Sequence, residues 1–520
     1  MTFYHYNLAN KFIEIANENI NSPALRYSER TFTYRELIDQ VEKLAALLLD
    51  RGLSQGDVIA IGHSKQPISY ALMLAALRLG VPYVNLDVCS PLNRNLHILD
   101  SSTASILFFD DRLHESSMLE LASAHGCPLL YLSVESLPQT SDHDLLKQLE
   151  LTKKVDGSCI AYIMFTSGST GIPKGVAITH QNVLHFIAWG QERFNITTHD
   201  NFANLSPMYF DNSVFDFYVG LFSGASITPI PRDLLTKTYE LVEYVGNMKC
   251  TVWFSVPSLL MYLMTMKALT IDKLTTVKKI IFGGEGYPKS ELKKLYKMFE
   301  NQAQLVNVYG PTESTCICSA HTLVEEDFDD LEGLPTLGYL NQNFDYRILD
   351  EENKDTAMGE LCLIGPNIAS GYFNDPERTS ISFVTLVEPK RYLKRMYRTG
   401  DLVRENANKL YFIGRMDNQI KHMGHRIELE EIEHALMRVQ LVNQAAVIYS
   451  RTQSTHGKLI GFIASSAEMD LAIVTQELRA MLPEYMVPTQ IIILAKLPTN
   501  QNGKIDKRQL ADISNEDLRL

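Results

Sequence analysis

Short apolar runs alternate with longer amphipathic stretches over the first 300 residues of the chain. One helix is predicted between Thr33, which forms a capping-box pattern with Glu36, and Gly52. Another is predicted at 70–79. Segments that read as strands lie at 58–61, 83–86, 104–109, 159–165, 251–255, 279–282 and 304–309. Strands that alternate with helices are typical of parallel, helix-covered sheets.

The pattern changes after about residue 335. Strands are predicted close together, with few long helices between them, at 345–349, 360–364 and 410–413, which favours an antiparallel or barrel-like section. A compact α+β pattern then follows, with helices at 428–439 and 470–481 and strands at 445–449, 458–464 and 490–495. We therefore predict an α/β fold. Residues 1–415 form a large N-terminal domain of two helix-covered sheets plus the barrel-like section, and residues 416–520 form a small α+β C-terminal domain.

Composition narrows the function classes. The chain of 520 residues is longer than one hydrophobic core usually accommodates, so at least two domains are expected. Its net charge of −13 disfavours binding to nucleic acid or to an anionic membrane, both of which need a basic face. No apolar run approaches the ~18 residues that span a bilayer, and the N-terminus lacks a signal-peptide pattern. Seven scattered cysteines without a C-x-x-C pair indicate reduced core side chains and a cytoplasmic location.

The segment Tyr162–Lys174 carries the strongest chemical signal. Its apolar strand stops at Thr166, and a loop rich in Ser, Thr and Gly follows. Such a loop presents N–H and O–H donors to phosphate, which predicts binding of a nucleoside triphosphate. It is not a Walker A loop, because Pro173 stands where that motif needs glycine, and no G-x-G-x-x-G follows a strand. A loop that only connects two elements is the alternative.

Six other segments follow the motif order of one superfamily, namely Leu77–Asp87, Asn307–Thr315, Gly359–Phe373, Tyr397–Val403, Gly414–Glu428 and Asn502–Lys507. Together with the loop, they resemble the adenylate-forming enzymes. This superfamily includes acyl-CoA synthetases, luciferases and the adenylation domains of nonribosomal peptide synthetases. The resemblance covers nearly the whole chain and is best with the adenylation domains.

The resemblance implies a two-step reaction. A carboxylate attacks the α-phosphate of ATP and releases pyrophosphate, and a thiol then displaces AMP. ATP and Mg²⁺ are the implied cofactors, with Glu313 as the metal ligand and Lys504, Thr166 and Glu313 as the catalytic residues. The implied nucleotide-binding residues are Thr166, Ser167, Gly168, Ser169, Thr170, Gly171, Lys174, Gly284, Glu285, Gly286, Asn307, Tyr309, Gly310, Thr312, Asp401, Arg415 and Lys504. Asp417 is the implied hinge of a mobile C-terminal lid.

The resemblance also implies an amino-acid substrate, because Asp211 matches the carboxylate that pairs with the substrate's α-amino group. Asp216 lies nearby and is a second candidate, although the motif favours Asp211. The implied pocket consists of Asp211, Asn212, Phe215, Ser255, Ile281, Gly283, Val308, Cys316 and Ile317, with Lys504 at its mouth. Between the aspartate and the lysine this wall is largely apolar and uncharged, which favours a small or medium neutral amino acid.

The implied partner is a phosphopantetheinyl carrier protein that is loaded in trans. The sequence contains no G-G-x-S carrier site, so we expect a stand-alone enzyme, although a domain excised from a larger synthetase would look the same. A D-alanine–carrier protein ligase and an acyl-CoA synthetase acting on an amine-free acid are alternatives. A silent scaffold that binds ATP without turnover is a third. His422 and His425 have no further ligands nearby to complete a metal site.

Overall fold

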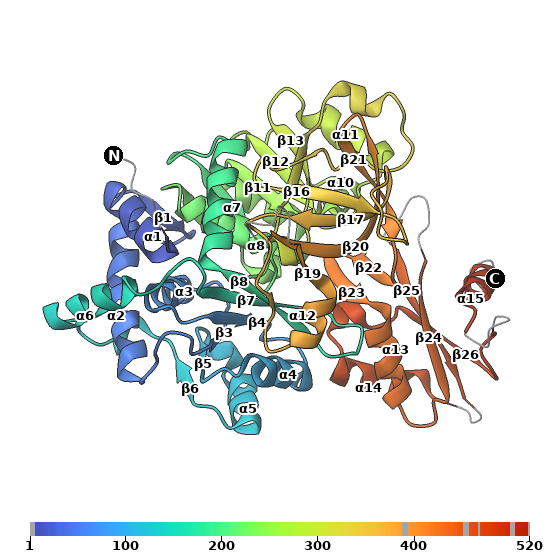
Figure 1. Cartoon of the computed structure of the whole chain (residues 1–520), viewed down its shortest axis with the longest axis horizontal. Coiled ribbons are helices and arrows are strands. Elements are labelled where there is room, and N and C mark those ends of the chain that lie inside the picture. The colour runs from blue at the N-terminus through green and yellow to red at the C-terminus, as the bar shows by residue number, and fades with distance from the viewer. Residues whose placement is uncertain (1–5, 387–393, 451–456, 466–468, 500–504, 518–520) are drawn as a thin grey trace. The chain divides into compact units, whose positions relative to one another are not determined.

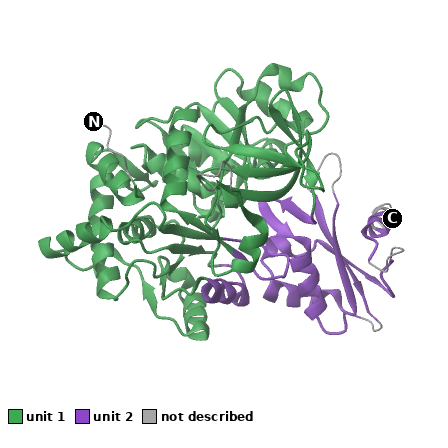
Figure 2. Cartoon of the chain, viewed as in Figure 1, with its two compact units in different colours: residues 1–88, 102–164, 175–416 green, residues 89–101, 165–174, 417–520 purple. Residues whose placement is uncertain are grey.

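The computed structural model describes residues 6–386, 394–450, 457–465, 469–499 and 505–517. The chain forms two compact units, shown in green and purple in Figure 2. Unit 1 comprises residues 1–88, 102–164 and 175–416, and unit 2 comprises residues 89–101, 165–174 and 417–520. Unit 2 therefore gathers the phosphate-loop segment and one further short segment with the C-terminal residues, a grouping that the sequence pattern did not indicate.

The first sheet of unit 1 has seven strands (Figure 1). Their spatial order is β18 (Gly371–Tyr372), β8 (Lys174–Thr179), β7 (Ile160–Thr166), β4 (Tyr83–Leu86), β3 (Ile59–Gly62), β5 (Ile106–Phe109) and β6 (Leu129–Tyr131). The strands from β7 to β6 are parallel, as the sequence predicted, and β18 joins β8 in the antiparallel sense. Lys174, expected at the end of the phosphate loop, is the first residue of β8.

The second sheet has nine strands. Their order is β15 (Tyr339–Leu340), β14 (Ser319–Thr322), β13 (Gln304–Tyr309), β12 (Lys279–Gly283), β11 (Val252–Ser255), β9 (Asn201–Asn204), β10 (Ser226–Pro229), β1 (Pro23–Arg26) and β2 (Thr31–Thr33). The strands from β13 to β1 are parallel. Their side chains alternate between two hydrophobic cores, as the pleat requires. Phe254, Ile281 and Val308 enter one core, whereas Trp253 and Phe282 enter the other.

The third sheet confirms the predicted antiparallel section. Its strands are β16 (Asp345–Leu349), β17 (Met358–Ile364), β20 (Lys394–Asn406), β19 (Phe383–Leu386) and β21 (Lys409–Arg415), and every described pairing is antiparallel. The long strand β20 pairs with β17, β19 and β21. It thereby brings Asp401 into register with Arg415 on β21.

Helices flank these sheets (Figure 1). The α-helices that lie in unit 1 are α1 (Leu8–Glu18), α2 (Tyr34–Asp50), α3 (Pro67–Leu79), α5 (Glu115–His125), α6 (Asp142–Thr152), α7 (His180–Arg193), α8 (Asn212–Val214), α9 (Thr238–Asn247), α10 (Pro257–Thr265), α11 (Lys289–Phe299) and α12 (Pro376–Ser382). The predicted capping box begins α2, since the Thr33 hydroxyl accepts the Glu36 N–H and the Glu36 carboxylate accepts the Thr33 N–H. A π-helix, Phe215–Gly220, continues directly from α8.

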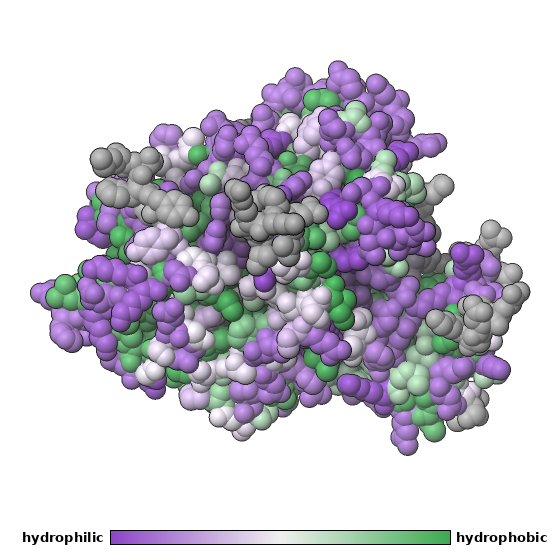
Figure 3. Space-filling model, in the orientation of Figure 1, coloured by the Kyte–Doolittle hydropathy of each residue, from purple (hydrophilic) through white to green (hydrophobic). Residues whose placement is uncertain are grey.

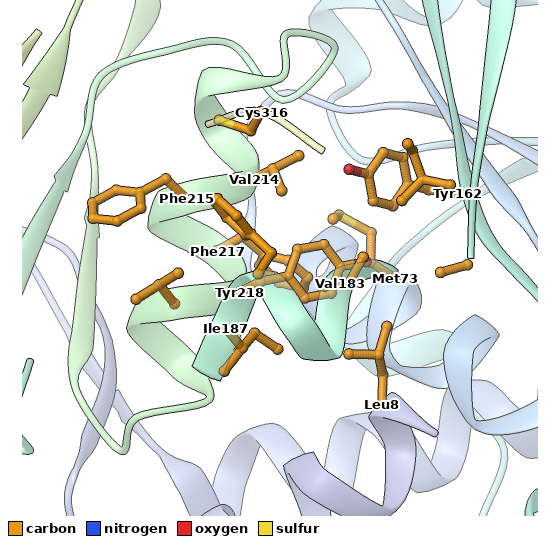
Figure 4. Packing of buried hydrophobic residues seen from close by; sticks show 14 of the residues in the cluster. Leu8, Met73, Tyr162, Val183, Ile187, Val214, Phe215, Phe217, Tyr218 and Cys316 are labelled. Atoms are coloured by element: carbon orange, nitrogen blue, oxygen red, sulfur yellow. The ribbon is translucent and has the colours of Figure 1, made fainter. Parts of the chain in front are cut away.

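The α8–π segment packs through aromatic side chains. Figure 4 shows Phe215, Phe217 and Tyr218 extending from it into the core beside Val183 and Ile187 of α7. Phe215 lies 5.5 Å from Phe254 and 5.5 Å from Phe202, centroid to centroid. These contacts fix the segment against the nine-stranded sheet.

Unit 2 has the α+β composition that the sequence predicted. It contains a two-stranded sheet, β22 (Gln419–His422) and β23 (His425–Glu428), and a three-stranded sheet, β24 (Gln444–Ser450), β25 (Lys458–Ala464) and β26 (Gln490–Leu494). Its helices are α13 (Leu429–Arg438), α14 (Leu471–Met481), α15 (Lys507–Asp517) and most of α4 (Leu92–Ser102). A separate hydrophobic core lies between α13, α14 and the larger sheet.

The visible surface is mainly hydrophilic, with apolar residues in broken patches on the face that Figure 3 shows. Among the described residues, no helix combines the length and apolar character needed to cross a bilayer. The seven cysteines are all free thiols, and Cys250, Cys316, Cys318 and Cys362 are buried.

A buried histidine makes the stability of unit 1 sensitive to acid. His180 has no exposed surface, and its Nδ1 accepts the Leu8 N–H at 3.1 Å. Burial lowers the pKa of His180 to about 3. Below the unfolded pKa of about 6.5 the unfolded chain takes up a proton that the folded chain refuses, so stability falls as pH falls.

We expect His180→Asn, which retains an acceptor for Leu8, to reduce this acid sensitivity. Between pH 7.5 and pH 5.0 the wild type should lose about 2 kcal/mol more unfolding free energy than the variant, as measured by urea unfolding. His199→Asn, at an exposed position, should leave the wild-type pH dependence unchanged. Equal losses in His180→Asn and the wild type would contradict the assignment.

Candidate active site

Several candidate residues lie where parallel strands of the nine-stranded sheet end. Ser255, Gly283 and Tyr309 are the last residues of β11, β12 and β13. The carboxyl edge of a parallel sheet is the usual location of a ligand site. The register pairs Gly283 with Val308, which brings two predicted pocket residues together. A Cβ on Gly283 would lie 2.3 Å from the Val308 carbonyl oxygen, so close packing of these strands requires glycine here.

The chain reverses sharply between β13 and β14. The Cys318 N–H donates to the Tyr309 carbonyl, and a Cβ on Gly310 would lie 2.3 Å from the Cys316 carbonyl oxygen. Thr315 and Cys316 both have left-handed backbones, with φ of 62° and 72°. A left-handed conformation is costly for a β-branched residue and persists only where its surroundings enforce it. Here the Thr315 hydroxyl donates to the Asn367 carbonyl at 2.7 Å.

This reversal also carries Thr312, whose hydroxyl donates to the Asp211 carboxylate at 2.5 Å. Asp211 is partly exposed and begins the α8–π segment. A π-helix inside a helical segment is often associated with a functional site. Asp216, the second candidate, is 1% exposed and accepts a hydrogen bond from Asn204 at 3.0 Å. Of the two aspartates, Asp211 is therefore the one available to a ligand.

Cys316 and Ile317 follow on the same reversal and are buried with Phe215, Phe254, Ile281 and Val308 in one core. Burial, and then the charge of Asp211, raise the pKa of the Cys316 thiol. The thiol therefore stays neutral and adds no charge to the predicted pocket wall. Asn212, by contrast, is partly exposed at the start of α8.

Ser255 does not join this group. On β11 the side chains alternate, and Ser255 lies on the Trp253 side of the sheet, where its hydroxyl accepts the indole N–H at 2.8 Å. Phe254 instead faces Ile281 and Val308 in the shared core. The assignment of Ser255 to the pocket therefore stays a prediction, and the period of two along the strand places the neighbouring Phe254 on the side of Ile281 and Val308.

Asp401 is held by two partners. Its Oδ1 accepts from Arg415 Nη1 at 2.6 Å, and its Oδ2 accepts from the Tyr309 hydroxyl at 2.5 Å. Burial, followed by the charge of Asp401, raises the pKa of the Tyr309 phenol well above its usual value. Tyr309 therefore remains a hydrogen-bond donor, and three predicted nucleotide-binding residues form one cluster.

Two further predicted nucleotide-binding positions have defined contacts. The Asn307 side-chain amide donates to the Thr336 carbonyl at 2.8 Å, which leaves its own carbonyl oxygen as an acceptor. In the segment after β12, Gly284 adopts a φ of 90°, and a Cβ on Gly286 would lie 2.8 Å from Leu334. The Glu285 carboxylate accepts the Ser258 N–H at the start of α10, at 2.7 Å.

Glu313 is fully buried. Its Oε1 accepts the Tyr372 hydroxyl at 2.8 Å, and its main-chain carbonyl accepts the Ala369 N–H at 2.9 Å. No group of three or more His, Cys, Asp or Glu side chains that could hold a metal occurs in the described part of the chain. Mg²⁺ commonly binds through one or two carboxylates together with substrate phosphates, and a single carboxylate at Glu313 fits that mode.

A family model described as AMP-binding enzyme matches residues 12–373, and the model of the AMP-binding enzyme C-terminal domain matches residues 431–504. The chain belongs to the AMP-binding enzyme family. The superfamily resemblance predicted from the motifs is thereby confirmed.

Two relatives of similar length are carrier protein ligases. The chain is 30% identical to the D-alanine–D-alanyl carrier protein ligase of Bacillus cytotoxicus, over 95% of this chain and 97% of the relative. It is 31% identical to the L-proline–[L-prolyl-carrier protein] ligase of Pseudomonas fluorescens, over 96% and 99%. Bacitracin synthase 1 of Bacillus licheniformis is 31% identical, but the match covers 96% of this chain and only 9% of that protein. The chain thus spans nearly all of some relatives and a small part of others.

The fold of this AMP-binding enzyme also matches solved structures. The Vibrio cholerae adenylation domain AlmE, in complex with glycyl-adenosine-5'-phosphate, superposes with a TM-score of 0.83 at 23% identity. The match covers 99% of both chains. The predicted α/β fold with a large N-terminal and a small C-terminal part is confirmed by this likeness.

The phosphate loop of this AMP-binding enzyme lies in unit 2. Thr166 Oγ1 is buried and has no hydrogen-bond partner among the described residues, so the structure leaves a donor available for phosphate. The Ser167 hydroxyl donates to the Arg426 carbonyl at 2.8 Å. Gly171 has a φ of 78°, and its N–H closes the loop onto the Gly168 carbonyl. Ser169 and Thr170 are exposed.

The same unit contains a contact that sequence reasoning missed. Arg94 of α4 forms an ion pair with Glu431 of α13 at 2.5 Å, with both side chains largely buried. Burial raises the pKa of Glu431, against the opposing charge of Arg94. No motif identified either residue, because the partners lie 337 positions apart in sequence.

The remaining predictions concern the C-terminal residues of this AMP-binding enzyme. Asp417, the implied hinge, is exposed at the first position of the C-terminal segment of unit 2, and its carboxylate accepts the Gln419 N–H at 3.2 Å. Lys504 lies outside the described residues. Its predicted catalytic role therefore stays a prediction.

The bond between Thr312 and Asp211 can be tested by its effect on stability. Thr312→Val removes the hydroxyl without changing the shape much, and leaves a partly buried carboxylate short of a donor. We expect a loss of about 1–3 kcal/mol in unfolding free energy, measured by urea unfolding at pH 7.5. Thr312→Ser keeps the donor and should lose less. Equal losses in the two variants would argue against the hydrogen bond as the cause.

Proposed function

We propose that this AMP-binding enzyme activates a small or medium neutral amino acid with ATP and transfers it to the phosphopantetheine thiol of a carrier protein. The position of Asp211 carries the proposal. It is a partly exposed carboxylate that begins the α8–π segment and borders a group of uncharged, apolar side chains. The two relatives of matching length are ligases that load amino acids onto carrier proteins.

Charge favours an amino acid over an amine-free acid. A carboxylate in a mainly apolar setting is costly unless a cation neutralises it, and an ammonium group supplies that charge. An amine-free acid would instead bring a second anion. This argument disfavours an acyl-CoA synthetase.

The apolar group favours a side chain without charge. Phe215, Phe254, Ile281, Val308 and Ile317 offer no partner for a charged substrate side chain. Phe254, which shares this core with Ile281 and Val308, adds a bulky apolar side chain to the proposed wall. A small or medium side chain is therefore proposed. D-alanine is one such substrate, and the relative from Bacillus cytotoxicus keeps it as a candidate.

In the proposed first step, the residues of unit 1 hold the two substrates. Asp401, fixed by Arg415 and Tyr309, would accept hydrogen bonds from the ribose hydroxyls, and the Asn307 carbonyl oxygen would accept one from adenine. Glu313 would hold Mg²⁺, which neutralises phosphate charge when bound. Thr166 and its loop would supply donors to the phosphates. Lys504 would add positive charge beside the reacting carboxylate.

For the second step we propose a carrier protein that the enzyme meets in the cytoplasm. The hinge role of Asp417 and the division of the chain at 415/416 belong to this proposal. They are supported by the break between units 1 and 2 between residues 416 and 417.

ATP–pyrophosphate exchange tests the first step. Wild-type enzyme should support exchange with at least one neutral amino acid and not with acetate or a fatty acid. Asp211→Asn should lower kcat/KM for that amino acid about 100-fold or more, because the ammonium loses its charged partner. Exchange driven only by amine-free acids would refute the proposal.

Asp233→Asn, at an exposed carboxylate of the same unit, is the matched control and should behave as wild type. Transfer of the activated amino acid to a holo-carrier protein, followed by mass spectrometry, tests the second step. An amino acid that is adenylated but never reaches any carrier thiol would limit the function to adenylation.

A further inference from the structure

A partly buried lysine lies against the ends of β9 and β10. Lys65 belongs to the loop between β3 and α3, and its ammonium donates to the carbonyls of Asn204, Leu205 and Ile230 at 2.7, 3.1 and 3.3 Å. Asn204 is the last residue of β9, and Ile230 directly follows β10. These two strands are parallel neighbours in the sheet. One ammonium thus supplies a donor to three main-chain carbonyls at the ends of these strands, although the Asn204 carbonyl also accepts the Ile230 N–H at 3.2 Å.

The backbone of Lys65 is fixed as firmly as its side chain. Its φ is 62°, a left-handed conformation that is unusual for lysine. Its N–H donates to His63 Nδ1 at 2.9 Å, and its carbonyl accepts the Tyr27 hydroxyl at 2.7 Å. The carboxylate of Asp110 accepts the N–H groups on either side, from Ser64 and Gln66. A residue whose unfavourable backbone conformation is fixed by several hydrogen bonds is typical of functional regions.

Asn204 connects this cation to an anion. Its side-chain amide donates to Asp216 Oδ2 at 3.0 Å, and its side-chain oxygen accepts the Tyr70 hydroxyl at 2.8 Å. Asn204, Tyr70 and Asp216 are 0%, 0% and 1% exposed. The second oxygen of Asp216 is buried without a partner among the described residues. A buried carboxylate in that state needs a compensating positive charge nearby, and Lys65 provides it.

Asp216 and Asp211 belong to one helical segment. Asp211 is in the right-handed helical region at the start of α8, and the π-helix continues without a break to Gly220. The segment is therefore fastened at one end by the bond from Thr312 to Asp211 and further along by the bond from Asn204 to Asp216. Phe217, the next residue, stacks on Tyr70 with centroids 6.0 Å apart. A shift at Asp216 would pass along this rigid element to Asp211.

We propose that Lys65 and Asp216 form a charge pair, joined through Asn204, that positions Asp211 for recognition of the substrate's amino group. Both are positioning residues, because they act through the helical segment and not by touching the substrate. The inference rests on the proposed function. None of the contacts described for Lys65, Asn204 or Asp216 reaches the Tyr309–Asp401–Arg415 cluster, so the pair should affect the amino acid and not ATP.

The two groups are electrostatically coupled. Burial raises the pKa of Asp216, and the Asn204 bond and the charge of Lys65 lower it. Burial lowers the pKa of Lys65, and the charge of Asp216 raises it. Each charge thus offsets part of the cost of burying the other. Other titratable groups around them are Tyr27, Tyr70, Asp110, His63 and the thiols of Cys250 and Cys316.

The test is a double-mutant cycle on the full chain, read by amino-acid-dependent ATP–pyrophosphate exchange. Lys65→Met and Asp216→Asn should each raise KM for the amino acid about 10- to 100-fold, because Asp211 is displaced, while KM for ATP stays within about twofold. The double variant K65M/D216N should have a lower KM for the amino acid than either single variant, since no buried charge is left unpaired.

Lys279→Met is the matched control. Lys279 faces Asp200 at 4.0 Å with side-chain exposures of 12% and 6%, but at the amino ends of β12 and β9. This variant should keep the wild-type KM for the amino acid. Should Lys65→Met or Asp216→Asn fail to fold, Tyr70→Phe removes one hydroxyl from the network, and it should raise KM for the amino acid about fivefold without changing KM for ATP.

Three outcomes would overturn the inference. KM values for ATP and amino acid that rise together would indicate general damage. Single-variant effects that multiply in the double variant would show that the two charges are independent. An unchanged KM for the amino acid in every variant would show that the network does not reach Asp211. If the wild type supports no exchange with any amino acid, the proposed function itself fails, and the inference fails with it.

Discussion

The sharp reversal of the chain between β13 and β14 is the constraint on which the candidate site depends. Gly310 packs against the Cys316 carbonyl, and two successive left-handed residues complete the turn. The nucleotide candidates Tyr309 and Thr312 enter the reversal, and the pocket candidate Cys316 leaves it. Because the backbone path is fixed, the residues proposed for the two substrates keep one relative position. Proximity of this kind is what a reaction between two bound anions needs most from the protein.

Three candidate carboxylates of unit 1 are stabilised in the same way. Asp211, Asp401 and Glu313 each accept a hydroxyl hydrogen bond, from Thr312, Tyr309 and Tyr372 respectively. A neutral hydroxyl donor thereby holds each of these carboxylates, and Arg415 adds a cation beside Asp401. Fixed dipoles around a charge need little reorganisation when a ligand arrives. The loss of folding free energy on burying these carboxylates is limited because each of them is hydrogen-bonded.

Much of this architecture could be predicted from the sequence, because apolar periodicity reports directly on burial. The strands predicted at 83–86 and 304–309 match β4 and β13 in both type and extent. Periodicity also shows which core each side chain of β11 enters, since alternation along the strand separates Phe254 from Trp253 and Ser255. The π-helix was not predictable in this way, because its four apolar or aromatic side chains fit an ordinary buried helix equally well.

Long-range polar contacts were beyond the reach of sequence reasoning. Lys65 lies in no motif and Asp216 was only the second candidate for pairing with the substrate's amino group, because their partners are set by where β9 and β10 end in space. The same applies to the ion pair between Arg94 and Glu431. Lys504 is the opposite case, since its motif is clear in the sequence but it lies outside the described residues.

The left-handed turn at Thr315 and Cys316 has a consequence for how this pocket can diversify. Neither position can accept a new side chain without also preserving a backbone that most residues avoid, and Gly310 admits no side chain at all. Substitutions that change substrate specificity are therefore expected at strand positions with ordinary backbone conformations, such as Ile281 and Val308. In directed evolution of the enzyme, substitutions at Ile281 and Val308 should likewise be tolerated better than substitutions at Gly310, Thr315 or Cys316.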